Sequence, residues 1–147
     1  DLSRSASKGS VKVEELFGVY SFQQVHQLIS TVSCELSPEI HFIDALSNAF
    51  PMGSMTGAPK VKAMQLIELF ENSKRGAYSG AVGYITPEKD FDFNVIIRSI
   101  LHNSKTNTSS FMVGSAITAN SIAQNEYDEC FVKAAALFQV IEKKQKN

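Results

Sequence analysis

The sequence has few cysteines, few histidines and no excess of charge of either sign. Cys34 and Cys130 are the only cysteines among 147 residues, which is too few for a disulfide framework, so buried thiols in a reducing cytoplasm are expected. His26, His41 and His102 have no metal-ligand spacing, which argues against a zinc site. The net charge of −1 gives no case for binding nucleic acid or an anionic membrane.

Long apolar segments are also missing from the sequence. No apolar run approaches the length of a membrane span, and the N-terminus has no signal-peptide pattern. With 44% hydrophobic and 20% charged residues, the chain has the composition of a soluble globular protein that could bury one core. A cytoplasmic protein without a membrane partner is therefore expected.

The hydrophobic periodicity predicts a mixture of strands and helices. Segments rich in β-branched and aromatic residues predict strands near 11–13, 77–86, 91–101 and 110–118, the last three as an antiparallel meander. The segment 25–36 favours a strand, with a helix as the alternative. Apolar residues at helical spacing and helix-start signals predict helices over 38–50, over 59–71 and from 121 to the lysine-rich end at Lys143, Lys144 and Lys146. Ser121 and Gln124 have the spacing of a capping box for the last helix.

The loop at 50–60, FPMGSMTGAPK, is the most informative local pattern. Gly53 and Gly57 permit a close approach of the backbone to a ligand, and Lys60 adds positive charge at the start of a helix. The loop is therefore either an anion-binding loop or a well-capped helix start. A nucleotide phosphate loop is excluded, because only three residues separate the glycines and a valine follows the lysine.

A second pattern lies on the last predicted helix. Glu126, Glu129 and Lys133 are three and four residues apart and therefore share one helix face. Taken alone, this spacing is typical of a surface ion pair.

Five segments together resemble the chorismate-utilising enzymes, which include anthranilate, aminodeoxychorismate and isochorismate synthases. They follow the family order over nearly the whole chain and are GSMTGAPKVKAM (53–64), RGAYSGAVGY (75–84), IR (97–98), EYDE (126–129) and Lys133. The resemblance implies an α+β fold with antiparallel sheet layers and helices packed outside, in which residues 1–147 form the C-terminal part of one chorismate-binding catalytic domain. The GSMTG form is most similar to component I of the aminodeoxychorismate (para-aminobenzoate) branch.

The resemblance also implies roles for individual residues. Glu129 corresponds to a Mg²⁺ ligand, and Glu126 to a supporting ligand. Lys133 and Arg98 correspond to substrate-binding residues, and Tyr78 to an aromatic residue that lines the same pocket.

Two loops complete the implied site. Gly114, Ser115 and Ala116 match a turn whose backbone N–H groups hold a substrate carboxylate, although the second glycine of the family turn is Ala116 here. Ser54 and Thr56 keep the hydroxyl groups that the family places against the reacting ring, so they are candidate catalytic residues. Lys60 of the same loop is a further candidate for binding the anionic substrate.

The sequence departs from the family at a catalytic histidine, which the family commonly places directly before Leu-[Val/Ile]-Ser. Here Gln27 occupies that position, and His26 lies one residue earlier. In a strand this offset points His26 to the opposite face, so we expect it to be structural. Gln27 could hydrogen-bond a leaving hydroxyl, but it could not serve as a general acid.

The implied activity is conversion of chorismate and ammonia to 4-amino-4-deoxychorismate in para-aminobenzoate and folate synthesis. Mg²⁺ is the implied cofactor, and a glutamine amidotransferase subunit is the implied source of ammonia. Asp1 resembles the first residue of the family segment Asp-Leu-x-Arg-Asn-Asp, so the rest of the catalytic domain is expected upstream. The alternatives are anthranilate synthase or another chorismate-utilising enzyme, and a catalytically silent fragment.

Overall fold

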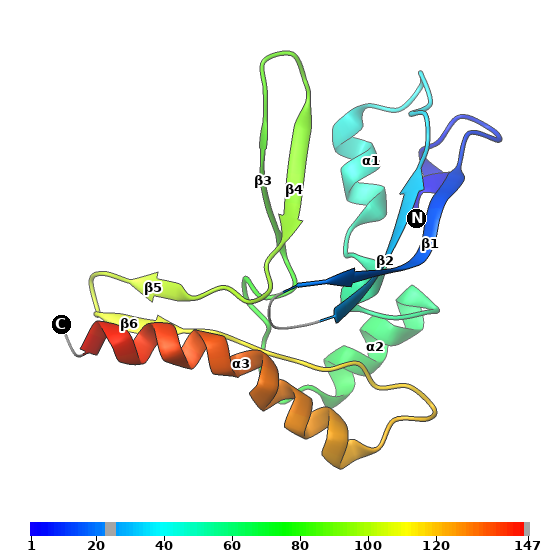
Figure 1. Ribbon diagram of the computed structural model, residues 1–147. Coiled ribbons are helices and arrows are strands. Elements are labelled where there is room, and N and C mark those ends of the chain that lie inside the picture. Colours follow the sequence, from blue (N-terminus) through cyan, green and yellow to red (C-terminus); the bar gives the residue numbers. More distant parts are fainter. Residues whose placement is uncertain (23–25, 146–147) are drawn as a thin grey trace. The chain divides into compact units, whose positions relative to one another are not determined.

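The computed structural model describes residues 1–22 and 26–145 (Figure 1). The chain divides into two compact units, unit 1 at Asp1–Ile67 and unit 2 at Glu68–Asn147. Val25 and Lys146, which the sequence places in a strand and at the lysine-rich helix end, lie outside the described residues. The fold is a mixture of helices and small antiparallel sheets, as predicted.

Unit 1 is built on one β-hairpin. Strands β1 (Lys12–Ser21) and β2 (His26–Ser33) pair antiparallel, with Ser21 opposite His26 and Lys12 opposite Ser33. The strands predicted near 11–13 and 25–36 are therefore confirmed, and the first is longer than its two alternating valines indicated. Short 3₁₀ helices lie at Leu2–Arg4 (η1) and Gly53–Met55 (η2).

The first α-helix begins later than the sequence predicts. Helix α1 spans Phe42–Ala49, so the prediction that it begins at Pro38 is wrong. A turn closes first, with the Ile40 N–H donating to the Ser37 carbonyl at 3.0 Å. His41 then caps the helix, because its Nδ1 accepts from the Ile43 N–H at 3.4 Å.

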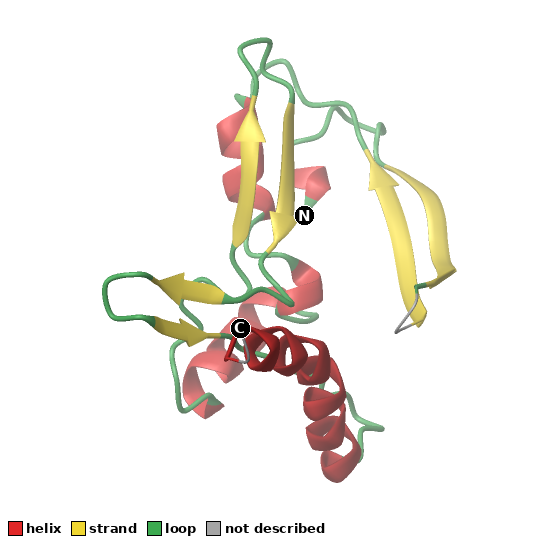
Figure 2. Cartoon of the chain, turned by 60° about the vertical axis from the view of Figure 1, so that its left-hand side comes forward, coloured by secondary structure: helices red, strands yellow, loops and turns green. Residues whose placement is uncertain are grey.

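Unit 2 contains two further hairpins and the longest helix. Strands β3 (Ala81–Ile85) and β4 (Phe91–Val95) form one two-stranded sheet, and β5 (Leu101–Asn103) and β6 (Thr108–Ser110) form another (Figure 2). Helix α2 (Lys60–Phe70) runs from unit 1 into unit 2, and α3 spans Ala123–Gln145. Both helices lie close to the predicted ranges.

The predicted meander is wrong, because the chain leaves the extended conformation between β4 and β5. Ile96 exchanges backbone hydrogen bonds with Ser79 and Gly80 just beyond the hairpin. Arg98 has a φ of +51°, which lies outside the extended region of a regular strand. The segment 91–101 therefore does not form one strand, and β6 ends at Ser110 instead of continuing to 118.

The capping box predicted for α3 does not form. The Ser121 hydroxyl accepts from the Thr118 N–H at 3.0 Å, and the Gln124 amide donates to Asp128 at 2.9 Å. Ser121 therefore closes the preceding loop, while Gln124 faces along the helix.

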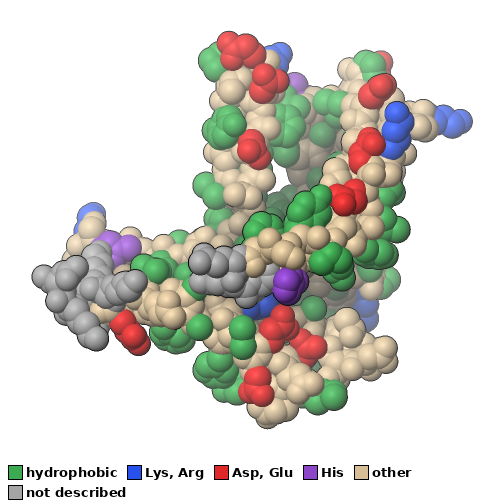
Figure 3. All heavy atoms as spheres, in the orientation of Figure 1, with side chains coloured by type: hydrophobic (Ala, Val, Ile, Leu, Met, Phe, Trp, Pro, Cys, Tyr) green, Lys and Arg blue, Asp and Glu red, His purple; other side chains and the backbone are tan. Residues whose placement is uncertain are grey.

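Among the described residues, the buried apolar core lies along α3. Ala134 and Leu137 are 3% and 7% exposed, and the rings of Phe111 and Phe138 meet edge to face at 5.1 Å. The hairpins are covered much less: Val19 and Leu28 in unit 1 remain 70% and 69% exposed. Figure 3 shows hydrophobic side chains spread over the face in view. Apolar surface of this kind is typical of a contact face.

None of the helices formed by the described residues combines the length and the apolar character that spanning a bilayer requires.

Candidate functional site

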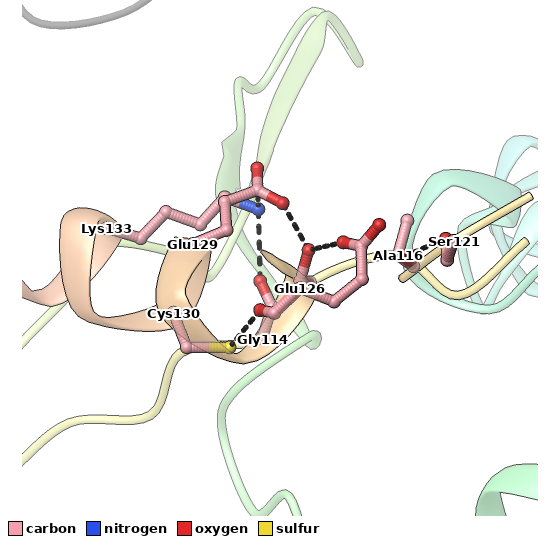
Figure 4. Close-up of polar contacts among 8 residues, drawn as sticks. Gly114, Ala116, Ser121, Glu126, Glu129, Cys130 and Lys133 are labelled. Atoms are coloured by element: carbon pink, nitrogen blue, oxygen red, sulfur yellow. Dashed lines mark hydrogen bonds and ion pairs between the residues drawn. The ribbon is translucent and has the colours of Figure 1, made fainter. Parts of the chain in front are cut away.

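Five of the predicted site residues meet in unit 2, where the start of α3 lies against the segment that follows β6. We call Gly114, Ser115, Glu126, Glu129 and Lys133 the carboxylate cluster (Figure 4). The helical spacing of Glu126, Glu129 and Lys133 puts all three on one face, as predicted. Residues 114–116, which have no regular secondary structure, correspond to the turn that the resemblance implies and are called the Gly114 turn below. They supply a carbonyl and a hydroxyl to that face.

Lys133 joins the helix to the Gly114 turn. Its Nζ donates to the Gly114 carbonyl at 3.1 Å and forms an ion pair with Glu129 at 3.0 Å. The Lys133 side chain is 29% exposed, so it is fixed by two partners but still reachable from solvent. An ammonium group held in this way is a suitable partner for a substrate carboxylate.

Ser115 bridges the two glutamates. Its hydroxyl is in hydrogen-bond contact with one oxygen of Glu126 and one oxygen of Glu129. A hydroxyl has one hydrogen and can donate to only one carboxylate at a time. Three oxygen atoms therefore converge on a small volume that carries the charge of two carboxylates.

Glu129 is held in its ionised form. The hydrogen bond from Ser115 lowers the pKa of Glu129 most, and the bond and charge of Lys133 lower it further. The carboxylate is thus negative at neutral pH, the state in which it can bind a cation.

The donor set of the carboxylate cluster fits a hard divalent cation. Mg²⁺ prefers carboxylate and other oxygen ligands, and it usually takes one or two carboxylates with water and substrate oxygens in the remaining positions. Glu126 and Glu129 supply two carboxylates on one face. Within the part of the chain that the structure describes, no histidine, cysteine or further acidic side chain joins the two glutamates to form a group of three that could hold a metal ion. Water and substrate oxygens would be suited to the remaining positions.

Tyr78 lies directly against the Gly114 turn. A Cβ atom on Gly114 would come within 2.9 Å of the Tyr78 hydroxyl, so a larger residue at this position would require the ring or the backbone at Gly114 to shift. Burial raises the pKa of Tyr78, whereas the charges of Arg75 and Lys133 lower it in part. The structure thus places Tyr78 beside the predicted substrate-binding turn.

Arg98 and Ala116 contribute less to this arrangement. Arg98 lies in unit 2 at the bend after β4, is exposed, and makes no hydrogen bond or ion pair within the described part of the chain. The carbonyl of Ala116 accepts from the Ser121 hydroxyl at 3.5 Å (Figure 4). Their roles in substrate binding remain predictions.

The glycine loop lies in unit 1, and its polar groups bond mainly within that unit. The Thr56 hydroxyl donates to the carbonyl of Met52 at 3.0 Å, which fixes the loop. Lys60 forms an ion pair with Asp1 at 2.5 Å and donates to the Ala49 carbonyl at 3.0 Å. Desolvation and the charge of Arg4 lower the pKa of Lys60. Ser54 is exposed.

Gly57→Ala is expected to destabilise the protein by about 1–2 kcal/mol. Gly57 has a φ of +149°, and an added Cβ would approach the Ala63 Cβ to 3.0 Å. Gly53→Ala is the matched control, because its φ is not in the positive range and its nearest contact would be 3.7 Å from Asp1. Thermal unfolding of both variants checks this. An equal shift in Tm would contradict the steric argument.

Gln27 and His26 lie in β2 with the alternation that the sequence predicts. His26 is exposed and its Nδ1 lies 2.9 Å from the Ser21 hydroxyl, a partner within the hairpin. Gln27 is less exposed and faces the other side of the strand. A catalytic role for Gln27 remains a prediction.

Sequence reasoning missed two features of this region. The hydroxyl of Ser115 lies in contact with both glutamates, whereas only the backbone of the turn was expected to act. Glu71 binds Arg75 with two oxygens, and their spacing of four residues is the signal that could have indicated the pair.

Comparison with known proteins gives a consistent set of relatives. Residues 1–139 match the family described as chorismate binding enzyme. The chain is 41% identical over 143 residues to a probable chloroplastic aminodeoxychorismate synthase from rice, Oryza sativa. It is 40% identical to aminodeoxychorismate synthase component 1 of Escherichia coli and 39% identical to anthranilate synthase component 1 of Bacillus subtilis. These matches cover 97%, 97% and 96% of this chain, respectively.

A solved structure is similar over most of the chain. Anthranilate synthase component I from Streptococcus pneumoniae superimposes with a TM-score of 0.81 at 38% identity, covering 90% of this chain and 30% of that structure. The chain spans 16%, 31% and 27% of the rice, E. coli and B. subtilis relatives. The family match over 139 residues and the cluster that it contains lead to one conclusion: the chain belongs to the chorismate binding enzymes.

Proposed function

We propose that the protein carrying this chain is component I of an aminodeoxychorismate synthase. It would replace the ring hydroxyl at C4 of chorismate with the nitrogen of ammonia, giving 4-amino-4-deoxychorismate and water. The observation that supports this best is the convergence of Ser115, Glu126, Glu129 and Lys133 beside the Gly114 turn. This arrangement offers a cation site and a carboxylate-binding site within one unit, as a dicarboxylate substrate requires.

The residues of the cluster would act mainly through charge and position. Lys133 would pair with a substrate carboxylate, and the N–H groups of the 114–116 turn would bind its oxygen atoms. Tyr78 would cover one side of that turn and limit the approach of water. A bound Mg²⁺ would be held by Glu126 and Glu129 and would supply positive charge beside the leaving hydroxyl. Holding the reactants in place in this way lowers the entropic part of the barrier.

The choice of branch rests on the loop at 53–57. Its sequence, GSMTG, favours the para-aminobenzoate branch. Anthranilate synthases more often carry Thr and Ser at the positions that Ser54 and Thr56 occupy here. Anthranilate synthase is the second candidate, since relatives of both kinds reach similar identity, 41% and 39%. The two reactions share the substrate and ammonia and differ in where the nitrogen is added and in whether pyruvate is released.

The test is a product analysis with the full-length protein, chorismate, ammonium and Mg²⁺. We expect 4-amino-4-deoxychorismate by mass spectrometry, with no turnover after Mg²⁺ is chelated. Fluorescent anthranilate with release of pyruvate would instead support the second candidate. Chorismate that remains unconsumed at saturating ammonium would refute both and favour a catalytically silent protein.

The proposal includes a glutamine amidotransferase as the partner that supplies ammonia, which fits relatives named component 1 of a synthase. The cytoplasmic location also remains a prediction. Cys34 and Cys130 are both free thiols, which a reducing compartment would maintain, but each is partly exposed, so the prediction that they are buried is wrong.

A further inference from the structure

Arg75 and Glu71 form a two-pronged ion pair just after α2. Arg75 Nε lies 2.9 Å from one carboxylate oxygen of Glu71, and Nη2 lies 2.5 Å from the other. The side chains are only 23% and 38% exposed. The hydrogen bonds from Arg75 lower the pKa of Glu71, so both groups are charged at neutral pH. Such a bidentate pair holds a guanidinium plane in one orientation.

The oriented guanidinium faces the turn that carries Tyr78. The Cζ atom of Arg75 lies 6.0 Å from the centre of the Tyr78 ring, within the range of a cation–π contact. Arg75 Nη1 also donates to the hydroxyl of Ser79 at 3.2 Å, and the Arg75 carbonyl accepts from the Tyr78 N–H at 3.0 Å. Ser79 is itself 8% exposed and has a φ of +68°, so the turn is fixed on both sides of the tyrosine.

This arrangement determines where the Tyr78 hydroxyl lies. The hydroxyl is so close to Gly114 that the turn has no room for a Cβ. A cavity of about 200 Å³ adjoins Arg75 and Tyr78 and is lined in part by Ile96, Phe111 and Met112. Arg75 lines this cavity together with Tyr78, so its polar contacts are placed to hold the ring where side-chain packing leaves a space.

We propose that Glu71 and Arg75 are positioning residues for the substrate site: together they hold Tyr78 against the Gly114 turn. The proposal rests on the proposed function where it concerns substrate, because it assumes that this turn binds chorismate. Neither side chain needs to touch the substrate. The Arg75 guanidinium is engaged by Glu71 and Ser79, so its effect would pass through the ring of Tyr78.

The first test needs no substrate. The full-length protein is labelled with tyrosine ¹³C at Cζ, and the Tyr78 resonance is assigned by its loss in Tyr78→Phe. Glu71→Gln, which keeps the shape but removes the charge, is expected to shift or broaden this resonance. Glu68→Gln is the matched control, because Glu68 pairs with Lys74 at 2.6 Å on a surface where both side chains are exposed by 73% or more. An unchanged Tyr78 resonance in Glu71→Gln would overturn the proposal.

The second test measures the effect on substrate. Glu71→Gln is expected to raise the KM for chorismate by about threefold to tenfold with kcat nearly unchanged, while Glu68→Gln leaves both unchanged. Arg75→Lys, which keeps the charge and loses the fork, should give a smaller rise than Arg75→Met. A shifted Tyr78 resonance together with an unchanged KM would refute the role in substrate binding.

The outcomes separate this proposal from the proposed function. If the wild-type protein does not consume chorismate, the proposed function fails and the Tyr78 resonance alone decides the positioning role. If chorismate is consumed but Glu71→Gln changes neither the KM nor the resonance, the positioning role fails and the proposed function stands. Thermal unfolding of each variant shows whether a change in KM or in the Tyr78 resonance arises because the variant is unfolded. If Glu71→Gln is unfolded, the same measurements on Arg75→Lys decide the positioning role.

Discussion

Glu129→Ala is expected to abolish the Mg²⁺-dependent turnover of chorismate by the full-length protein, with a loss of about 10³-fold in kcat. Glu129 lies at the centre of the carboxylate cluster, where it contacts both the Ser115 hydroxyl and Lys133. Its removal would take away the proposed cation ligand and would also leave Lys133 without its carboxylate partner. The positive charge of Lys133 would then lie where the cation is expected to bind.

The measurement combines initial rates with titration of the metal. Binding of Mn²⁺ as a probe, followed by electron paramagnetic resonance without substrate, should weaken strongly in Glu129→Ala. Asp128→Ala is the control, because it removes the same charge from the neighbouring position of α3, where Asp128 bonds Gln124 and not the cluster. The assignment of Glu129 as a metal ligand would be refuted by unchanged Mn²⁺ binding, and equal losses in both variants would indicate a general effect on the helix.

The local elements could be predicted from the sequence because local patterns determine them. The apolar spacing of α2 and α3 and the alternation of β2 appear directly in the residue order. The capping of α1 by His41 could not be read in this way, because Ser37-Pro38 is an equally good start signal. The same holds for the break after Val95, where the backbone of Ile96 turns to bond Ser79 and Gly80 across a distance of 16 residues or more.

Only part of the candidate site could be predicted from the sequence. Helical spacing alone puts Glu126, Glu129 and Lys133 on one face, but it does not distinguish a site from a surface ion pair. The family resemblance is what favoured a functional site over a surface ion pair at these three residues. Neither source could indicate that the Ser115 hydroxyl reaches both glutamates, because that contact depends on how the 113–117 segment lies against α3.

Gly114→Ala is the second change for which a large effect is expected, a rise of about 10- to 100-fold in the KM for chorismate. The added Cβ would meet the Tyr78 hydroxyl at 2.9 Å, so either the ring or the turn must move. Moving the turn also shifts the carbonyl that binds Lys133 at 3.1 Å. Steady-state kinetics of the full-length protein with chorismate, ammonium and Mg²⁺ provide the measurement.

Combining Gly114→Ala with Tyr78→Phe distinguishes two explanations. One is a steric clash between the added Cβ and the Tyr78 hydroxyl, and the other is a requirement for the backbone flexibility of glycine at position 114. Without the hydroxyl, the nearest remaining atom of the ring is Cζ, at 3.8 Å from the added methyl carbon, which is an ordinary contact. The double variant should therefore recover to the KM of Tyr78→Phe alone. If the two effects simply add, the steric explanation is wrong, and the flexibility of glycine in the turn is what the site needs. Recovery would instead show that the turn tolerates a methyl group, as Ala116 indicates two residues later, and that Gly114 is required because of its neighbour.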